Sequence, residues 1–203
     1  MKLVPIALAV ATLAFSAAVS AQTTTYTTAA TFLANVAPGS YTEGFADPFF
    51  SGELSASFSG GAFAYTVSAP GGLYGNGSLI GTNLPNEILT VTFTGAAVTA
   101  VGGNFWATNI SDAFQATPVT LRLSNGTTSV FTPASETAGS FRGFTSALAI
   151  TSMTIASTAA VYAGMGNLTV GAVAPIPEPG TWLLMGLGVS ALLLRNARRN
   201  AQG

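Results

Sequence analysis

Threonine and serine dominate the central part of the chain, and their positions favour strands over helices. Residues 22–175 contain 25 threonines and 15 serines but only eight charged side chains. Within 89–94, Leu89, Val91 and Phe93 alternate with threonines, which is the period of two typical of a half-buried strand. Because β-branched and aromatic side chains suit a pleated surface, we expect this region to be mostly sheet.

Further segments have the composition of short strands separated by Gly, Pro and Asn. The predicted strands are 63–67, 89–94, 98–108, 119–124, 127–132, 141–145, 150–155 and 168–170. Asn125-Gly126 predicts a type I′ hairpin turn, and Gly102-Gly103 predicts a bulge that interrupts strand 98–108. Residues 28–36 predict one short helix, which ends before Pro38. We therefore expect an all-β fold, a jelly-roll-like antiparallel β-sandwich.

The composition excludes several classes of protein. The 203 residues include no His and no Cys, so the usual zinc, haem and iron–sulfur ligands, disulfides and His- or Cys-centred catalysis are absent. Only six residues are Lys or Arg, whereas nucleic-acid binding needs clustered positive charge to neutralise phosphates. We expect no nucleic-acid partner and no enzymatic activity.

The first 21 residues have the pattern of a secretory signal peptide. Lys2 precedes an apolar run over 3–18, and small residues lead to a predicted cleavage between Ala21 and Gln22. The alternative is a buried or membrane helix that is retained. Cleavage would place the following domain outside the inner membrane.

A second targeting pattern begins at 175. Pro177, Glu178 and Pro179 form an extended spacer, which is followed by Thr181 and Trp182. Residues 181–194 carry no charge and predict a helix of roughly 21 Å, which is short for a hydrocarbon core about 30 Å thick. Three arginines suited to the cytoplasmic side of a membrane follow: Arg195, Arg198 and Arg199.

This tail resembles the PEP-CTERM sorting signal of exported bacterial proteins. The resemblance implies recognition by the secretion machinery and by exosortase, a membrane protease–transpeptidase that cuts near Pro-Glu-Pro. It also implies transient membrane anchoring, followed by release to the cell envelope or extracellular matrix, where many such proteins accompany exopolysaccharide. The same segment has been labelled an ice-binding protein C-terminal region. A plain, permanent membrane anchor is the alternative.

The middle of the chain resembles the jelly-roll domains found in PEP-CTERM proteins. The shared elements are Phe32-Leu33, Glu43-Gly44-Phe45, Gly143-Phe144-Thr145-Ser146 and Thr151-Ser152-Met153-Thr154-Ile155. Sugar-binding jelly rolls often hold a structural calcium between an early Glu and a late Asp. The resemblance thus implies Glu43, Asp47 and Asn167 as candidate calcium ligands, although Gly166 stands where an acid is usual.

Sugar binding needs exposed aromatic faces. Phe49, Phe50, Tyr74 and Trp106 are the candidate platform, and Tyr65 and Tyr162 are further aromatic candidates. Glycoside hydrolysis would require two converging carboxylates, and solvated turn acids are the simpler interpretation of Glu43, Asp47 and Glu53. A single threonine stripe at 90–94 does not make the flat plane that ice binding would need.

We therefore divide the chain into a signal peptide (1–21), a β-sandwich domain (22–174) and a sorting tail (175–203). The predicted function is structural or adhesive, in contact with exopolysaccharide. A permanently anchored carbohydrate-binding module or carbohydrate-active enzyme is the alternative.

Overall fold

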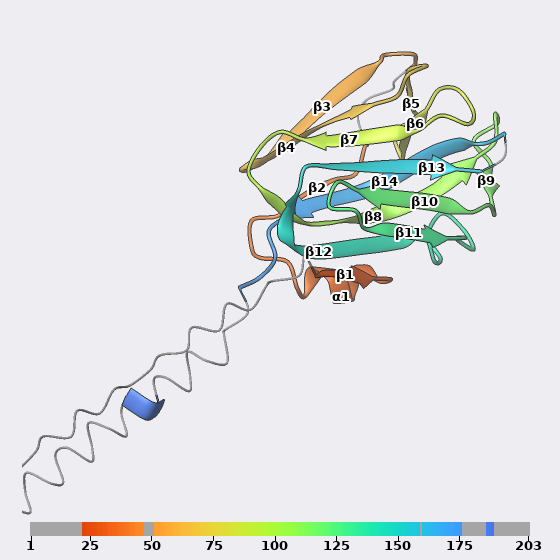
Figure 1. The fold of residues 1–203 in the computed structure, drawn as a ribbon. Helices are drawn as coiled ribbons and strands as arrows, with labels where there is room; N and C mark the ends of the chain where they lie inside the picture. The colour runs from red at the N-terminus through yellow and green to blue at the C-terminus, as the bar shows by residue number, and fades with distance from the viewer. Residues whose placement is uncertain (1–21, 47–50, 159, 176–185, 189–203) are drawn as a thin grey trace, which may run out of the picture.

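The structure is a computed structural model, which describes residues 22–46, 51–158, 160–175 and 186–188. Within these ranges the chain folds into two antiparallel sheets (Figure 1). The first sheet contains β1 (Thr23–Tyr26), β2 (Tyr41–Glu43), β5 (Leu73–Gly75), β6 (Ile80–Thr82), β8 (Val98–Thr108), β9 (Phe114–Gln115), β12 (Phe141–Ile150) and β14 (Tyr162–Gly171). The second contains β3 (Ser55–Gly60), β4 (Phe63–Ser68), β7 (Leu89–Phe93), β10 (Val119–Leu123), β11 (Thr128–Phe131) and β13 (Ser152–Ser157).

Along the chain, successive strands or pairs of strands belong alternately to the first and to the second sheet. The first sheet has the order β1-β12-β8-β14-β6-β5, with β2 also paired to β14 and β9 paired to β8. The second has the order β11-β10-β13-β7-β4-β3. All the ladders between named strands are antiparallel, so the predicted all-β, antiparallel architecture is confirmed.

One hydrophobic core fills the space between the sheets. In β4, Phe63, Tyr65 and Val67 are buried and alternate with partly exposed residues. The same cluster includes Phe105 and Met165 of the opposite sheet. The alternation predicted from the sequence therefore separates core-facing from outward-facing side chains, as a two-sheet fold requires.

A short helix covers part of the outer face of the first sheet. The helix α1 (Ala29–Leu33) begins after Thr28, whose hydroxyl caps it by accepting a hydrogen bond from the Thr31 N–H. Its Phe32 is fully buried against Gly102 and Gly143, where a Cβ would lie 2.9 and 2.6 Å from the ring. These glycines allow the ring to rest directly on the sheet.

The predicted bulge at Gly102-Gly103 is wrong in its placement. The strand β8 is continuous through these residues in its pairing with β12. The irregularity lies in β14, where two residues, Asn167 and Leu168, stand opposite Gly103. Asn167 has a φ of 52°, a left-handed conformation that Asn tolerates better than most residues.

The predicted type I′ turn is also wrong, although the hairpin is present. The strands β10 and β11 pair as expected, with Arg122 opposite Thr128. Only Gly126 has a positive φ, at 91°, and its N–H donates to the Leu123 carbonyl while the Leu123 N–H donates to Thr127. This is the pattern of a three-residue loop with a glycine bulge.

The segments at residues 1–21 and 181–194, predicted as signal and membrane helices, lie outside the described residues, except for 186–188. Within the part of the chain that the structure describes, no helix is long and apolar enough to cross a membrane.

Candidate functional site

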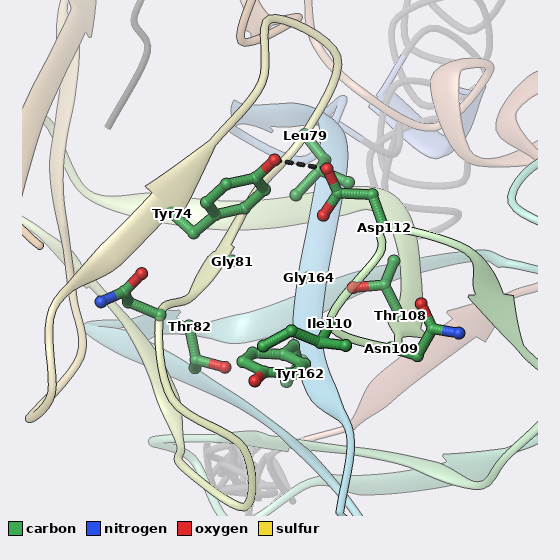
Figure 2. A pocket seen from close by; sticks show the side chains of 12 residues that line it. Tyr74, Leu79, Gly81, Thr82, Thr108, Asn109, Ile110, Asp112, Tyr162 and Gly164 are labelled. Carbon is green, nitrogen blue, oxygen red and sulfur yellow. Dashed lines mark hydrogen bonds between the residues drawn. The ribbon is translucent and has the colours of Figure 1, made fainter. Parts of the chain in front are cut away.

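A pocket of about 180 Å³ opens on the outer face of the first sheet, where β8 ends and β14 begins (Figure 2). Gly81 of β6 and Gly164 of β14 are paired across the sheet and lie in its floor. Their neighbours Ile80 and Met165 are buried in the core, so the two glycines face outward. A Cβ on Gly81 would lie 2.7 Å from the Ala163 carbonyl oxygen, so this position is restricted to glycine.

Two tyrosines stand at the sides of this floor. Tyr74 of β5 and Tyr162 of β14 both line the pocket, together with Leu79 and Ile110. In Figure 2 the two rings lie at opposite ends of the glycine floor. The pocket thus combines aromatic and apolar walls with an exposed backbone surface.

Tyr74 is joined to the turn between β8 and β9 by a hydrogen bond. The Tyr74 hydroxyl donates to Oδ2 of Asp112, and this bond is the largest reason why the pKa of Tyr74 lies above its usual value, with burial and the negative charge of Asp112 adding to it. The interaction connects residues 38 positions apart in the sequence. It spans one end of the pocket in Figure 2.

The turn that carries Asp112 is fixed by its own hydrogen bonds. Oδ1 of Asn109 accepts from the N–H groups of Ser111 and Ala113 at 2.9 and 3.1 Å, and the Asp112 N–H donates to the Asn109 carbonyl at 3.0 Å. Asp112 itself has a φ of 59°. The carboxylate is therefore held in a fixed position at the side of the pocket.

Further polar groups complete the lining. Asn83, Thr108 and Asn109 contribute amide and hydroxyl groups, and Thr82 is fully buried beneath them. Oγ1 of Thr82 has no hydrogen-bond partner among the described residues. The pocket can therefore both donate and accept hydrogen bonds at several points.

The structure separates the predicted platform residues. Tyr74 lines the pocket, and so does the further candidate Tyr162, whereas Phe49 and Phe50 lie outside the described residues. The prediction of Trp106 as an exposed platform is wrong, because only 5% of this residue is exposed. Its ring packs over Gly166, where a Cβ would lie 2.9 Å from Cη2.

The candidate calcium residues Glu43 and Asn167 come together, while Asp47 lies outside the described residues. Glu43 stands opposite Leu168 in the pairing of β2 with β14, and Oδ1 of Asn167 lies 3.7 Å from where a Cβ on Gly44 would stand. Calcium takes six to eight oxygen ligands, more than these two side chains supply. In the described residues no group of three or more acidic, His or Cys side chains could hold a metal, so calcium stays a prediction.

Glu43 is instead part of a tyrosine cluster. Its Oε2 accepts from the Tyr41 hydroxyl and its Oε1 accepts from the Phe45 N–H at 2.9 Å. Burial, this hydrogen bond and the charge of Glu43 raise the pKa of Tyr41 to about 12. The neighbouring Tyr65 is fully buried, with no partner for its hydroxyl among the described residues, and burial raises its pKa as well.

The fold and the pocket define an antiparallel two-sheet protein with a pocket lined by tyrosine and polar residues on the outer face of one sheet. Comparison with known proteins indicates where this protein is sorted, because residues 175–199 match the PEP-CTERM protein-sorting motif. The chain therefore carries a PEP-CTERM sorting signal, the mark of an exported protein processed by exosortase. No match to the chain was found among curated proteins or solved structures.

The match includes the predicted motif residues Pro177, Glu178, Pro179, Thr181 and Trp182 and the arginines at 195, 198 and 199. All of these residues lie outside the described ranges. The predicted cleavage between Ala21 and Gln22 stays a prediction, and Gln22 directly precedes β1.

Proposed function

We propose that this protein is a non-catalytic component of the cell envelope or extracellular matrix, which binds polysaccharide through the pocket between Tyr74, Asp112 and Tyr162. The observation that carries the proposal is the pocket itself, because it joins two tyrosine rings to a fixed carboxylate and to amide and hydroxyl groups. A sugar has apolar C–H faces that pack on aromatic rings and hydroxyls that pair with such polar groups.

The distribution of acids supports binding over hydrolysis. Glycoside hydrolases use two carboxyl groups about 5–9.5 Å apart on either side of the scissile bond. Among the described residues that line the pocket, Asp112 is the single carboxylate. Glu43, which the sequence predicts as a calcium ligand, instead accepts hydrogen bonds from the Tyr41 hydroxyl and the Phe45 N–H.

The strand order supports a jelly-roll assignment for the domain. Eight strands in chain order, β6, β7, β8 and β10 to β14, form two four-stranded sheets with the orders β6-β14-β8-β12 and β7-β13-β10-β11. This is the interleaved arrangement of two Greek keys that defines a jelly roll. The strands β3 and β4 then extend one sheet, and β1 extends the other.

The position of the pocket relative to the sorting signal fits an adhesive role. The strand β14 starts at Tyr162 in the pocket and ends at Gly171, four residues before Pro175, where the matched motif begins. At about 3.3 Å per residue, this strand separates the two by roughly 30 Å. Residues after β14 are held by the segment following α1, since the Ala174 N–H donates to the Asn35 carbonyl at 2.9 Å. The pocket on the outer face of the first sheet therefore lies near the end of β14 that is opposite to Pro175.

The test is a pull-down of the exported protein with insoluble polysaccharide, combined with mass spectrometry of its termini. We expect retention of the wild-type protein, strong loss of retention for Asp112→Ala, and a C-terminus near Pro177. Equal retention of both proteins would contradict binding at this pocket. An intact C-terminus at Gly203 would contradict processing and favour permanent anchoring.

A further inference from the structure

We propose that the exported protein has a modified N-terminus, in which Gln22 has closed into the five-membered lactam pyroglutamate. This inference does not involve the pocket, and it rests on the predicted signal-peptide cleavage between Ala21 and Gln22. Two observations lead to it. One is the chemistry of a terminal glutamine, and the other is the position of Gln22 directly before a hydrogen-bonded cluster that links the two sheets.

Cleavage before Gln22 would bring together two groups of the same residue that react with each other. The α-amino nitrogen attacks the side-chain carbon Cδ, a new N–C bond closes the ring, and the bond from Cδ to Nε2 breaks. The departing nitrogen takes a proton from the α-amine and leaves as ammonia. The reaction therefore needs no oxidant, reductant or second substrate. It also removes the positive charge of the chain terminus.

The structure leaves Gln22 accessible for this reaction. The residue is exposed and lies just before β1, which begins at Thr23. The pairing of β1 with β12 also begins at Thr23, which stands opposite Ser146, so Gln22 is outside the sheet. Ring closure changes torsion angles of Gln22 alone. The fold of Thr23 and the residues after it therefore does not need to change.

A polar cluster, which consists of Thr23, Asn125, Thr127 and Ser146, begins directly after Gln22. Oγ1 of Thr23 accepts from Nδ2 of Asn125 at 3.0 Å and from the Thr127 hydroxyl at 2.9 Å. Nδ2 of Asn125 also donates to the Ser146 hydroxyl at 3.0 Å. Thr23 and Ser146 belong to the first sheet, whereas Asn125 and Thr127 lie in the loop between β10 and β11 of the second. The cluster therefore links the edge strand β1 to the opposite sheet.

A lactam at Gln22 would protect this cluster. Aminopeptidases bind a free α-amino group and remove one residue at a time, and a lactam offers no such group. The sequence contains no Cys, so no disulfide holds β1. Chain termini are common sites of fraying and proteolysis, and the loss of two residues would remove Thr23. A blocked Gln22 would therefore keep the edge strand complete outside the cell.

The test is mass spectrometry of the N-terminal peptide of the exported protein. We expect this peptide to begin at residue 22 and to lack the mass of one ammonia. Edman degradation should proceed only after treatment with pyroglutamyl aminopeptidase. Gln22→Asn is the matched control, because it keeps the amide but is one methylene shorter, so closure would require a strained four-membered ring. This variant should retain a free α-amine, and a purified aminopeptidase that leaves the wild type intact should remove its residues 22 and 23.

A second variant tests the cluster itself. Thr23→Val removes the acceptor shared by Asn125 and Thr127 and keeps Gln22. The lactam should then still form, while the melting temperature falls by about 2–4 °C. The trimmed Gln22→Asn protein should show a fall at least as large, whereas the untrimmed variant should melt like the wild type.

Each contrary result has a distinct meaning. A peptide that begins at residue 22 with an unmodified glutamine would overturn the lactam. A chain that begins at another residue would overturn it together with the predicted cleavage. If aminopeptidase does not trim Gln22→Asn, the protective role is wrong. None of these results depends on polysaccharide binding, so they are distinct from a failure of the proposed function.

Discussion

Two tyrosine–carboxylate pairs occupy different positions in this molecule, and one is local in the sequence while the other joins distant segments. Tyr41 and Glu43 are two residues apart within β2, beside the fully buried Tyr65. Tyr74 and Asp112 come from the strand β5 and the turn after β8, at the edge of an open pocket. The same chemical pair thus orders one strand and the residues directly after it in one place, and joins two distant parts of the chain at a pocket in the other. The two pairs differ in whether the carboxylate's remaining hydrogen-bond acceptor sites face protein or solvent.

The sharpest way to break this comparison is to remove each carboxylate in turn. Glu43→Ala leaves the Tyr41 hydroxyl and the Phe45 N–H without their acceptor. We expect a loss of about 2–3 kcal/mol in the free energy of unfolding, because hydrogen bonds to charged groups are the stronger ones. The melting temperature should fall by roughly 5–10 °C, measured by circular dichroism. A change below 1 °C would show that these hydrogen bonds do not stabilise β2 and the residues after it.

The second carboxylate should matter for binding and little for stability. Asp112→Ala removes the acceptor of the Tyr74 hydroxyl at a half-exposed position. We expect polysaccharide or glycoside affinity to fall about tenfold, which corresponds to about 1.4 kcal/mol. The melting temperature should change by less than about 2 °C. Glu136→Ala, which removes an acid outside the pocket lining, is the matched control and should bind like the wild type.

Alkaline titration tests the buried side of the comparison. Tyrosines ionise near pH 10 in an unfolded chain, whereas the pKa of Tyr41 is raised to about 12 and that of Tyr65 is also raised. The folded state therefore holds these protons longer, so stability is intact below about pH 10 and falls as pH rises toward 12. Tyr65→Phe should move the midpoint of alkaline unfolding to higher pH without a loss of stability at pH 7, because it deletes a buried hydroxyl that has no partner among the described residues. An unchanged midpoint would contradict this.

The smallest expected effect concerns calcium near Glu43. If Glu43, Asn167 and Asp47 hold a weak site of millimolar affinity, 5 mM calcium should stabilise the domain by about 1 kcal/mol and raise its melting temperature by about 2–4 °C. Magnesium at the same concentration is the control. A melting temperature that calcium does not change would contradict a calcium site in this cluster. Tyr41 and Phe45 would then be the partners of Glu43.

Some strands could be predicted closely from the sequence, whereas only 141–145 of β12 and 168–170 of β14 could be predicted. The prediction for 98–108 coincides with β8, and that for 89–94 nearly coincides with β7. The strands β5 and β6 have three residues each, and so short a run shows no periodicity. Both were missed, and they form one wall of the pocket.

The site itself depends on contacts that no local pattern contains. Tyr74 was a candidate, but its partner Asp112 is 38 residues away and is positioned by the Asn109 turn. The burial of Thr82 and Trp106 likewise results from tertiary packing. An Asn followed three residues later by an Asp, directly after a long strand, is the local signal that could have drawn attention to the turn at 109–112.

The path of β14 also determines how the domain would respond to mechanical load. This strand lies in the interior of the first sheet, paired with β8 on one side and with β2 and β6 on the other. A pull between a glycan held beside Tyr162 and the motif beginning at Pro175 would act along the strand axis. Load carried by the pocket residues of β6 and of the turn after β8 would reach β14 through its ladders with β6 and β8, and those hydrogen bonds would be loaded in shear, many at once. With a glycan bound as proposed, this loading would suit the domain to holding a polymer under tension.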